Sequence, residues 1–207
     1  MEDLKKVIRH EVLQKRRQLS YDEVKTRSAN IYKRLKSLRA FQESKSILIY
    51  VAMSDEVQTN EMLQDSFDDK KIVAVPIVRK MEELLLLSVL SESHVNELLT
   101  GTINNESSNW SKSKFGILEP GKNTVKPISI SEIDLIIVPG LGFDKSMTRL
   151  GFGGGHYDRL LEKRNEAAIS IAVAFDFQVY PHIPHCAYDQ KVDIIITDKE
   201  IIQPDRC

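Results

Sequence analysis

Cysteine is scarce in this sequence, and its scarcity narrows the possible classes of protein. The 207 residues include two cysteines, Cys186 and Cys207. Two thiols make neither the disulfide framework of a small secreted domain nor a four-ligand zinc site. We therefore expect a reducing, cytoplasmic location.

Long apolar runs and a large net charge are also missing. A membrane-spanning helix needs about 20 consecutive apolar residues, and the longest candidate here, around 84–87, is far shorter. Charged residues scattered from Glu2 to Arg17 leave no apolar segment for a signal peptide. The formal net charge of -1 argues against a protein that binds nucleic acid regardless of sequence. We therefore expect neither a membrane nor a nucleic acid among its partners.

Short apolar runs alternate with helical patterns along most of the chain. Two amphipathic helices open it, and Ser20 with Glu23 forms a capping box for the second. The runs that predict strands are 47–53, 72–78, 84–90, 135–138, 169–175 and 192–197. This pattern predicts an α/β fold with a mainly parallel sheet flanked by helices. With 42% apolar residues, we expect one domain over 1–207, with the helical segment 1–40 packed on it.

Ligands of such sheets gather at the carboxyl ends of the strands. Three of the predicted strands lead to Met53, Val138 and Phe175. We expect the residues that follow these three positions to meet in one cleft.

Glycine is uncommon but concentrated, since four of the nine glycines lie in 151–155. A strand at 135–138 precedes this loop, and a helix start is expected near Tyr157 and Asp158. Glycine backbone amides can approach an anion closely, and a helix N-terminus adds partial positive charge. The spacing matches neither a Walker A loop nor the dinucleotide pattern, and a surface turn is the alternative. Arg149 could clamp a terminal phosphate and Asp158 could hold Mg²⁺, which favours binding of a nucleoside triphosphate.

Several segments together resemble the 5-formyltetrahydrofolate cyclo-ligase (5,10-methenyltetrahydrofolate synthetase) family. The resemblance is strongest at VPGLGFD (138–144) and RLGFGGGHYDRLL (149–161). It recurs in the family's order at KVIRHEVLQKRRQLS, DEVQT, FGILEP and DQKVDIIIT, so it covers nearly the whole chain. Relatives usually carry Tyr-Tyr-Asp where this chain has His156-Tyr157-Asp158, and some carry Lys in place of Gly154.

The resemblance implies a fold like that of sugar-phosphate isomerases and CoA-transferases. It implies a ligase that uses ATP and Mg²⁺ to convert 5-formyltetrahydrofolate to 5,10-methenyltetrahydrofolate, ADP and phosphate. Polyglutamylated forms of this folate are further candidate substrates. In the implied mechanism, the formyl oxygen attacks the γ-phosphate, N10 then attacks the activated carbon, and phosphate leaves. We expect a monomer.

The resemblance also implies which residues contact ATP. Lys5 and Arg9 match a Lys-x-x-x-Arg pattern that faces the nucleotide; a solvated basic helix face is the alternative. Arg149 would be the catalytic residue that neutralises charge on the transferred phosphate. The implied ATP-binding residues are Lys5, Arg9, Arg149, Leu150, Gly151, Phe152, Gly153, Gly154, Gly155, His156 and Tyr157. The neighbouring cluster Lys15-Arg16-Arg17 is interpreted as surface.

Folate and metal contacts follow from the same resemblance. Glu56 would grip the pterin ring, because a carboxylate can accept two hydrogen bonds from an aminopyrimidine edge. The other implied substrate contacts are Val51, Met53, Phe115 and Tyr157, with ordinary core packing as the alternative for Val51 and Phe115. Asp158 and Asp189 would bind Mg²⁺.

Three other functions remain open at this stage. The first is a non-catalytic regulator of the same fold that binds folate or nucleotide. The second is a sugar-phosphate isomerase or CoA-transferase relative, which would need no ATP. The third is RNA binding through the basic N-terminal helix, which the near-neutral net charge disfavours.

Overall fold

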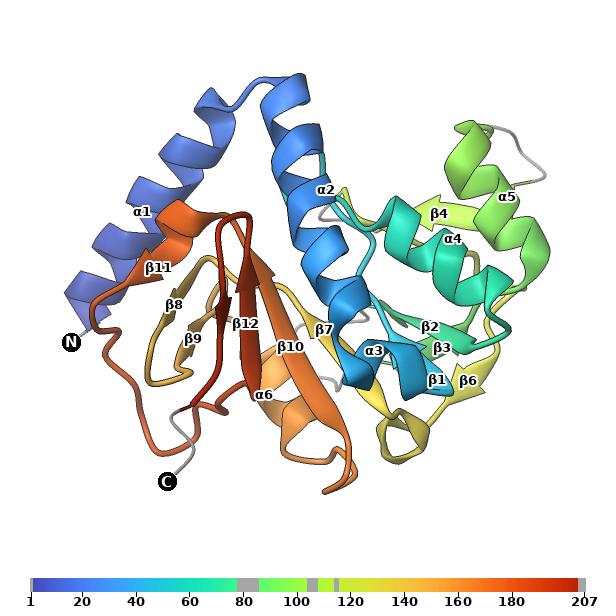
Figure 1. Ribbon diagram of the computed structural model, residues 1–207. Helices are drawn as coiled ribbons and strands as arrows, with labels where there is room; N and C mark the ends of the chain where they lie inside the picture. Colours follow the sequence, from blue (N-terminus) through green and yellow to red (C-terminus); the bar gives the residue numbers. More distant parts are fainter. Residues whose placement is uncertain (1, 78–85, 104–107, 114–115, 205–207) are drawn as a thin grey trace.

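The computed structural model describes residues 2–77, 86–103, 108–113 and 116–204. A central sheet has the strand order β13-β12-β10-β7-β1-β2-β3-β6 (Figure 1). Its strands are β1 (Ser46–Leu48), β2 (Ile72–Ile77), β3 (Leu86–Val89), β6 (Pro127–Ile128), β7 (Leu135–Val138), β10 (Ile169–Ala174), β12 (Ile194–Thr197) and β13 (Ile201–Ile202). The five strands from β2 to β12 in this order pair in parallel, and the antiparallel strands lie outside them. The predicted mainly parallel sheet is confirmed.

Helices and two smaller sheets complete the fold. The helices are α1 (Glu2–Gln18), α2 (Tyr21–Ser37), α3 (Arg39–Glu43), α4 (Asn60–Asp68), α5 (Glu92–Thr100) and α6 (His156–Leu161), with 3-10 turns η1 (Ile130–Glu132) and η2 (Asp176–Gln178). One small sheet joins β8 (Gly142–Asp144), β9 (Arg149–Leu150) and β11 (Val179–Tyr180), and the other joins β4 (Trp110–Lys112) and β5 (Leu118–Pro120).

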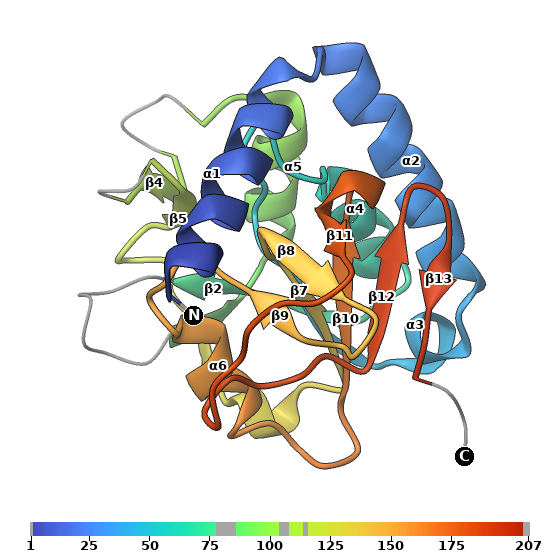
Figure 2. The ribbon, with the colours of Figure 1, turned by 90° about the vertical axis from the view of Figure 1, so that its left-hand side faces the viewer.

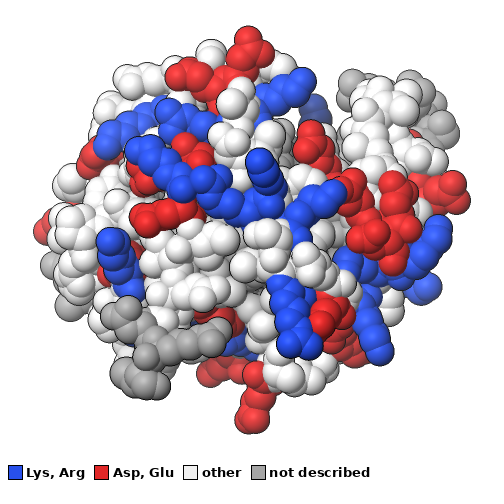
Figure 3. Space-filling model, in the orientation of Figure 1, with Lys and Arg blue, Asp and Glu red and all other residues white. Residues whose placement is uncertain are grey.

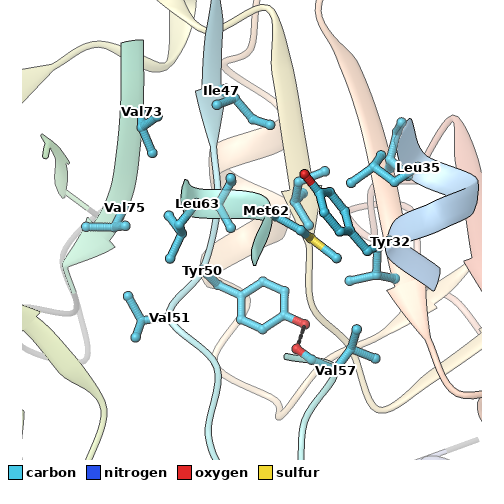
Figure 4. Packing of buried hydrophobic residues seen from close by; sticks show 14 of the residues in the cluster. Tyr32, Leu35, Ile47, Tyr50, Val51, Val57, Met62, Leu63, Val73 and Val75 are labelled. Carbon is cyan, nitrogen blue, oxygen red and sulfur yellow. Dashed lines mark hydrogen bonds between the residues drawn. The ribbon is translucent and has the colours of Figure 1, made fainter. Parts of the chain in front are cut away.

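Alternating side chains bury both faces of the central sheet. In β7, Leu135 and Ile137 join the core beneath α2, α3 and α4, whereas Ile136 and Val138 join the core on the face covered by α6. Figures 1 and 2 show these helices on opposite sides of the sheet. Figure 4 shows the larger core, where the Tyr50 hydroxyl donates a 2.9 Å hydrogen bond to the Val57 carbonyl. Two-sided burial explains why the strands are continuous apolar runs.

The first predicted strand is shorter than its apolar run. We expected 47–53, but β1 ends at Leu48, and the Ile49 N–H makes a last hydrogen bond to the Ala74 carbonyl. The chain then leaves the sheet, since the Tyr50 carbonyl accepts a hydrogen bond from the Thr59 hydroxyl instead of a neighbouring strand. The apolar residues that follow β1 therefore lie past its carboxyl end, at the end of the sheet.

The two N-terminal helices pack on different parts of the molecule. The predicted capping box of α2 is present: the Ser20 hydroxyl accepts from the Glu23 N–H, and the Glu23 carboxylate accepts from the Ser20 N–H. This helix covers the large sheet. Helix α1 instead packs Ile8 and Val12 against the β8–β9 hairpin and Ile183. Figure 2 shows α1 beside this hairpin.

The described helices all carry charged residues, and none of them suits a membrane. Within the described ranges, no helix combines the length and apolar character that crossing a bilayer requires. Lys and Arg side chains form a band across one face, and Asp and Glu side chains border it (Figure 3). Charge of both signs on this face agrees with the near-neutral composition.

The β8–β9 hairpin separates β7 from the glycine loop, and Asp144 anchors it. The Asp144 side chain is fully buried. Its carboxylate accepts hydrogen bonds from the Ser146 and Thr148 N–H groups within the hairpin, and from the Ile183 N–H across to the C-terminal segment, at 3.0, 3.1 and 2.8 Å. One side chain therefore joins two segments that carry candidate site residues.

We expect Asp144→Ala to lower the free energy of unfolding by about 3 kcal/mol or more, because three buried N–H groups lose their acceptor. Urea denaturation of the variant and of Asp3→Ala, whose side chain is almost fully exposed, measures the difference. A loss below about 1 kcal/mol would show that these amides find other partners.

Candidate functional site

The carboxyl ends of β1, β7 and β10 meet at a recess. The five parallel strands follow the order β2-β1-β7-β10-β12, so their connections reverse direction between β1 and β7. Ligands of doubly wound sheets bind at such a switch point. The recess is lined by Arg16, Tyr50, Glu56, Val57, Pro139, Gly140, Val173 and Gln178. The predicted meeting of segments that follow three strands is confirmed.

Gln178 ties two of these segments together. Its amide Nε2 donates to the carbonyls of Gly140 and Leu141, at 2.9 and 3.1 Å. Its Oε1 accepts from the Phe175 N–H. The side chain is buried, so these bonds fix the turn after β7 against the turn after β10. This role could not be predicted from the sequence, because a lone glutamine in a loop has no distinguishing pattern.

Glu56 lies buried at the recess. Its Oε2 accepts a 3.0 Å hydrogen bond from the Met53 N–H, and its Oε1 lies 3.4 Å from Arg16 Nη2. Burial raises the pKa of the Glu56 carboxyl, and the Arg16 charge and the Met53 N–H partly oppose that rise. Glu56 thus lies in a desolvated position with the Arg16 cation beside it.

Arg16 corrects the sequence interpretation. We took the cluster Lys15-Arg16-Arg17 as surface, but Arg16 is 2% exposed. Its Nε donates to the Asp55 carbonyl at 2.9 Å and its Nη2 to the Asp55 carboxylate at 2.7 Å. The planar guanidinium provides several donors at fixed angles, and burial without them would be costly. Its neighbours Lys15 and Arg17 are exposed, as expected.

Arg149, Tyr157 and Asp158 form a second group next to the recess. Arg149 Nη2 pairs with Asp158 Oδ2 at 2.8 Å, and the guanidinium carbon lies 5.7 Å from the centre of the Tyr157 ring. Burial raises the pKa of the Tyr157 hydroxyl, the Arg149 charge opposes the rise, and the Glu56 charge adds to it. Tyr157 therefore lies within electrostatic reach of both Glu56 and Arg149.

Two polar atoms of this group have no hydrogen-bond partner among the described residues. They are Arg149 Nε and the Tyr157 hydroxyl, and both are buried. Buried polar groups are nearly always paired, so these atoms indicate a position for ligand atoms. Their orientation could not be read from the sequence.

The glycine loop continues from Arg149. Gly151 has no room for a side chain, because a Cβ atom there would lie 2.6 Å from Arg149 Nη1. Gly153 has a φ of 105°, which L-amino acids rarely adopt. Arg9 reaches the loop from α1, and its Nε donates to the Gly151 carbonyl at 3.0 Å. The structure brings Arg9, Arg149 and the glycine loop together as expected.

Lys5 and Asp189 lie on the same side of the site. Lys5 Nζ donates to Asp189 Oδ2 at 2.9 Å, and the same oxygen accepts from the Cys186 N–H. Partial burial acts to raise the pKa of Asp189, but these two hydrogen bonds and the charges of Lys5 and Arg149 outweigh it, so the pKa is lowered. Asp189 is therefore held as a carboxylate near Arg149.

Asp158 and Asp189 fit a magnesium ion that arrives with phosphate. Asp158 Oδ1 accepts from the Gln190 N–H, which places the two carboxylates in adjoining segments. Over the described ranges, no three His, Cys, Asp or Glu side chains gather as a metal cluster. Mg²⁺ commonly takes one or two carboxylates and completes its shell with waters and phosphate oxygens. Two carboxylates beside the glycine loop match the protein part of that donor set.

The remaining candidate residues differ in how they can contribute. Leu150 and Val51 are buried in core clusters, so Leu150 offers only its backbone to a ligand. Figure 4 shows Val51 within the core. Met53 is half-buried and Phe152 is exposed. Phe115 lies outside the described residues. His156 Nδ1 lies 3.3 Å from Arg159 Nη2, and burial and the Arg159 charge lower its pKa.

Comparisons with known proteins agree with this geometry. A 5-formyltetrahydrofolate cyclo-ligase of Mus musculus is 32% identical over 198 residues, which cover 93% of this chain and 92% of the mouse protein. The 5-formyltetrahydrofolate cyclo-ligase of Haemophilus influenzae is 27% identical over 159 residues, which cover 75% of this chain and 77% of the Haemophilus protein. The NMR structure of Aquifex aeolicus 5,10-methenyltetrahydrofolate synthetase has a TM-score of 0.78 at 29% identity, covering 99% of this chain and 94% of that one.

A structure of a Mycoplasma pneumoniae 5,10-methenyltetrahydrofolate synthetase, 23% identical with a TM-score of 0.69 over 94% of this chain and 98% of that one, supports the fold alone. A model of the 5-formyltetrahydrofolate cyclo-ligase family matches residues 1–198. The match spans both groups of the site, and this chain belongs to the 5-formyltetrahydrofolate cyclo-ligase family.

Proposed function

We propose that this chain carries out its family's reaction between the two groups described above. The reaction is the ATP-dependent closure of 5-formyltetrahydrofolate to 5,10-methenyltetrahydrofolate, with release of ADP and phosphate. Folate would enter the recess beside Glu56, and ATP would lie along the loop 149–155. The observation that carries this proposal is that Arg149 Nε and the Tyr157 hydroxyl are buried without a partner among the described residues, at the start of the glycine loop and its helix.

The reaction needs positioning more than covalent help from the protein. The formyl oxygen attacks the γ-phosphorus, and ADP leaves with the electrons of the broken P–O bond. N10 then adds to the activated carbon, and the carbon–oxygen bond breaks to release phosphate as N10 gives up its proton. Holding reactants in line and neutralising phosphate charge are the main contributions available to side chains.

Arg149 is suited to the phosphate that is transferred. Its side chain is 5% exposed, and water screens its charge little. Its Nε is available to a ligand oxygen. On ATP binding, Arg149 would exchange its contact with Asp158 for γ-phosphate oxygens. The loop amides, Arg9 and Lys5 would hold the rest of the triphosphate, with Leu150, Phe152 and His156 contributing backbone contacts.

Asp158 and Asp189 would hold Mg²⁺ with the phosphate oxygens. The ion, when bound, neutralises charge on the β- and γ-phosphates. Lys5 would orient Asp189 through the hydrogen bond that it already makes.

Glu56 is suited to one edge of the pterin ring. One carboxylate oxygen accepts from Met53, and both keep further lone pairs for the N–H groups of an aminopyrimidine. Met53 and Tyr157 would supply apolar contact to the flat ring, as would Phe115, while Val51 would support them from the core. The recess is small in this structure, so the ring would occupy its mouth.

We also propose that residues 1–207 form one α/β domain that acts as a monomer in the cytoplasm. The scarcity of cysteine supports a reducing compartment.

An absorbance assay tests the function. Purified protein with 5-formyltetrahydrofolate and Mg²⁺ should form the near-ultraviolet methenyl chromophore only when ATP is added, with ADP in equal amount. Folded protein that binds both ligands without turnover would identify the non-catalytic regulator instead.

We expect Arg149→Ala to lower kcat by a factor on the order of 10³ and to change the Kd for folate by less than about threefold, because the charge acts on the transferred phosphate. Single-turnover kinetics and equilibrium folate binding separate the two quantities. Lys163→Ala, which removes an exposed positive charge just after α6, provides the control. Equal losses in both quantities would remove Arg149 from the catalytic role.

We expect Asp158→Asn and Asp189→Asn each to raise the Mg²⁺ concentration for half-maximal activity by about tenfold or more, because a neutral amide is a weaker ligand for a hard cation. Magnesium titrations at fixed ATP measure this concentration, with Asp176→Asn as control. A lower kcat at an unchanged Mg²⁺ midpoint would contradict the metal role.

A further inference from the structure

Helix α1 has charged residues at both ends of its buried face. The buried residues are Lys5, Ile8, Val12 and Arg16, at spacings of three and four that place them on one side of the helix. Lys5 reaches the Asp189 side of the site, and Arg16, about 16 Å further along the axis, reaches the recess at Glu56. The proposed function assigns a role to Lys5 but none to Arg16.

The contacts of Arg16 are directed at the loop after β1. Two of them hold Asp55, and the third places Nη2 3.4 Å from Glu56 Oε1. Helix α2 supports the same loop from the other side, where the Gln58 N–H donates to the Ser28 hydroxyl at 2.9 Å. The loop that carries Glu56 is thus held between both N-terminal helices.

Arg16 is the cation that faces the Glu56 carboxylate. The other ionisable groups around it are Asp55 on the same loop, Tyr50 beyond β1, and Tyr157 on α6. The negative charge of Asp55 disfavours a second negative charge on Glu56. The two tyrosines carry no positive charge that would stabilise it. Burial further disfavours the anion, so the charge of Arg16 and the Met53 N–H are what sustain it.

We propose that Arg16 is a positioning residue for folate recognition, which holds the Glu56 carboxylate as an anion with its free lone pairs directed into the recess. The inference rests on the proposed function, because it takes Glu56 as the acceptor for the N–H edge of the pterin ring. Arg16 itself does not contact the reacting atoms. It acts by fixing the charge and orientation of the group that does contact the substrate.

The geometry distinguishes this role from a purely structural one. A structural ion pair would be satisfied by Asp55 alone, which already accepts two hydrogen bonds from Arg16. The contact with Glu56 lies at the recess and connects the arginine to the ligand position. A ring N–H pair accepted by Glu56 would therefore bind more weakly once the carboxylate becomes neutral, even in a well-folded protein.

The test compares Arg16→Met, Arg16→Lys and the control Arg17→Met. Arg17 is the next residue on the same helix, is exposed, and carries the same charge. At pH 7.5 we expect Arg16→Met to raise the Kd and KM for 5-formyltetrahydrofolate about tenfold or more. The KM for ATP and kcat at saturating folate should change by less than about threefold. Arg16→Lys should lose less affinity for folate than Arg16→Met, because lysine keeps the positive charge. Some affinity should still be lost, because lysine cannot reach both carboxylates.

The pH dependence of folate binding is the second readout. Glu56 accepts the ring N–H groups only as an anion, so affinity is lost as the pH falls through its pKa. Removing Arg16 removes a cation that lowers this pKa, and the loss should therefore begin at a higher pH in Arg16→Met than in the wild type. The Arg17→Met profile should coincide with the wild-type profile.

Two results would overturn the inference. One is a folded Arg16→Met protein with the folate Kd and pH profile of Arg17→Met. The other comes from a double-mutant cycle: losses from Arg16→Lys and Glu56→Gln that simply add would show that the residues act independently. The cycle also serves if Arg16→Met fails to fold. Wild-type protein that binds folate but forms no methenyl product would instead contradict the proposed function, while the binding comparison would still test Arg16.

Discussion

Three buried cations stabilise the site, and each one pairs with an anion from another element of the fold. Lys5, Arg16 and Arg149 have side chains 10%, 2% and 5% exposed, and they pair with Asp189, Asp55 and Asp158. An unpaired charge at such depth would cost several kcal/mol. These pairs therefore fix α1 against the loop after β1 and the C-terminal segment, and fix the glycine loop against α6. The position of every proposed ligand contact depends on that pairing.

The same pairing prepares the site for a polyanion. Arg149 already lies in a desolvated position, so it would need little rearrangement when its partner changes from the Asp158 carboxylate to a phosphate oxygen. In the proposed reaction, Asp158 would lose Arg149 in such an exchange and become available to hold Mg²⁺. Arg149 Nε and the Tyr157 hydroxyl have no hydrogen-bond partner in the described part of the chain, so both atoms remain available to a ligand. Arg149 and Asp158 thus stabilise the fold as an ion pair, and the same two charges would bind ligands once the pair opens.

Much of the fold could be predicted from the sequence because local patterns determine it. Apolar runs long enough for a strand buried on both faces predicted β2, β7, β10 and β12, and their carboxyl ends predicted the cleft. The glycine loop and its helix were also readable. The β8–β9 hairpin between β7 and that loop was not, since its strands are two and three residues long and depend on Asp144, a contact between distant segments.

Helix α1 shows why the remaining part of the site could not be read. The helical spacing of Leu4, Val7, Ile8 and Val12 predicts an apolar face through these residues, but Leu4 and Val7 are 47% and 59% exposed. The buried face is rotated toward Lys5 and Arg16, because turning the helix that way lets both cations reach their carboxylates. Hydrophobic burial favours an apolar face by about 25 cal/mol per Å², whereas leaving a buried carboxylate such as Glu56 without a cation costs several kcal/mol. Where a helix lines a charged site, the ion pairs therefore influence its orientation, and apolar periodicity alone predicts only part of the buried face, here Ile8 and Val12.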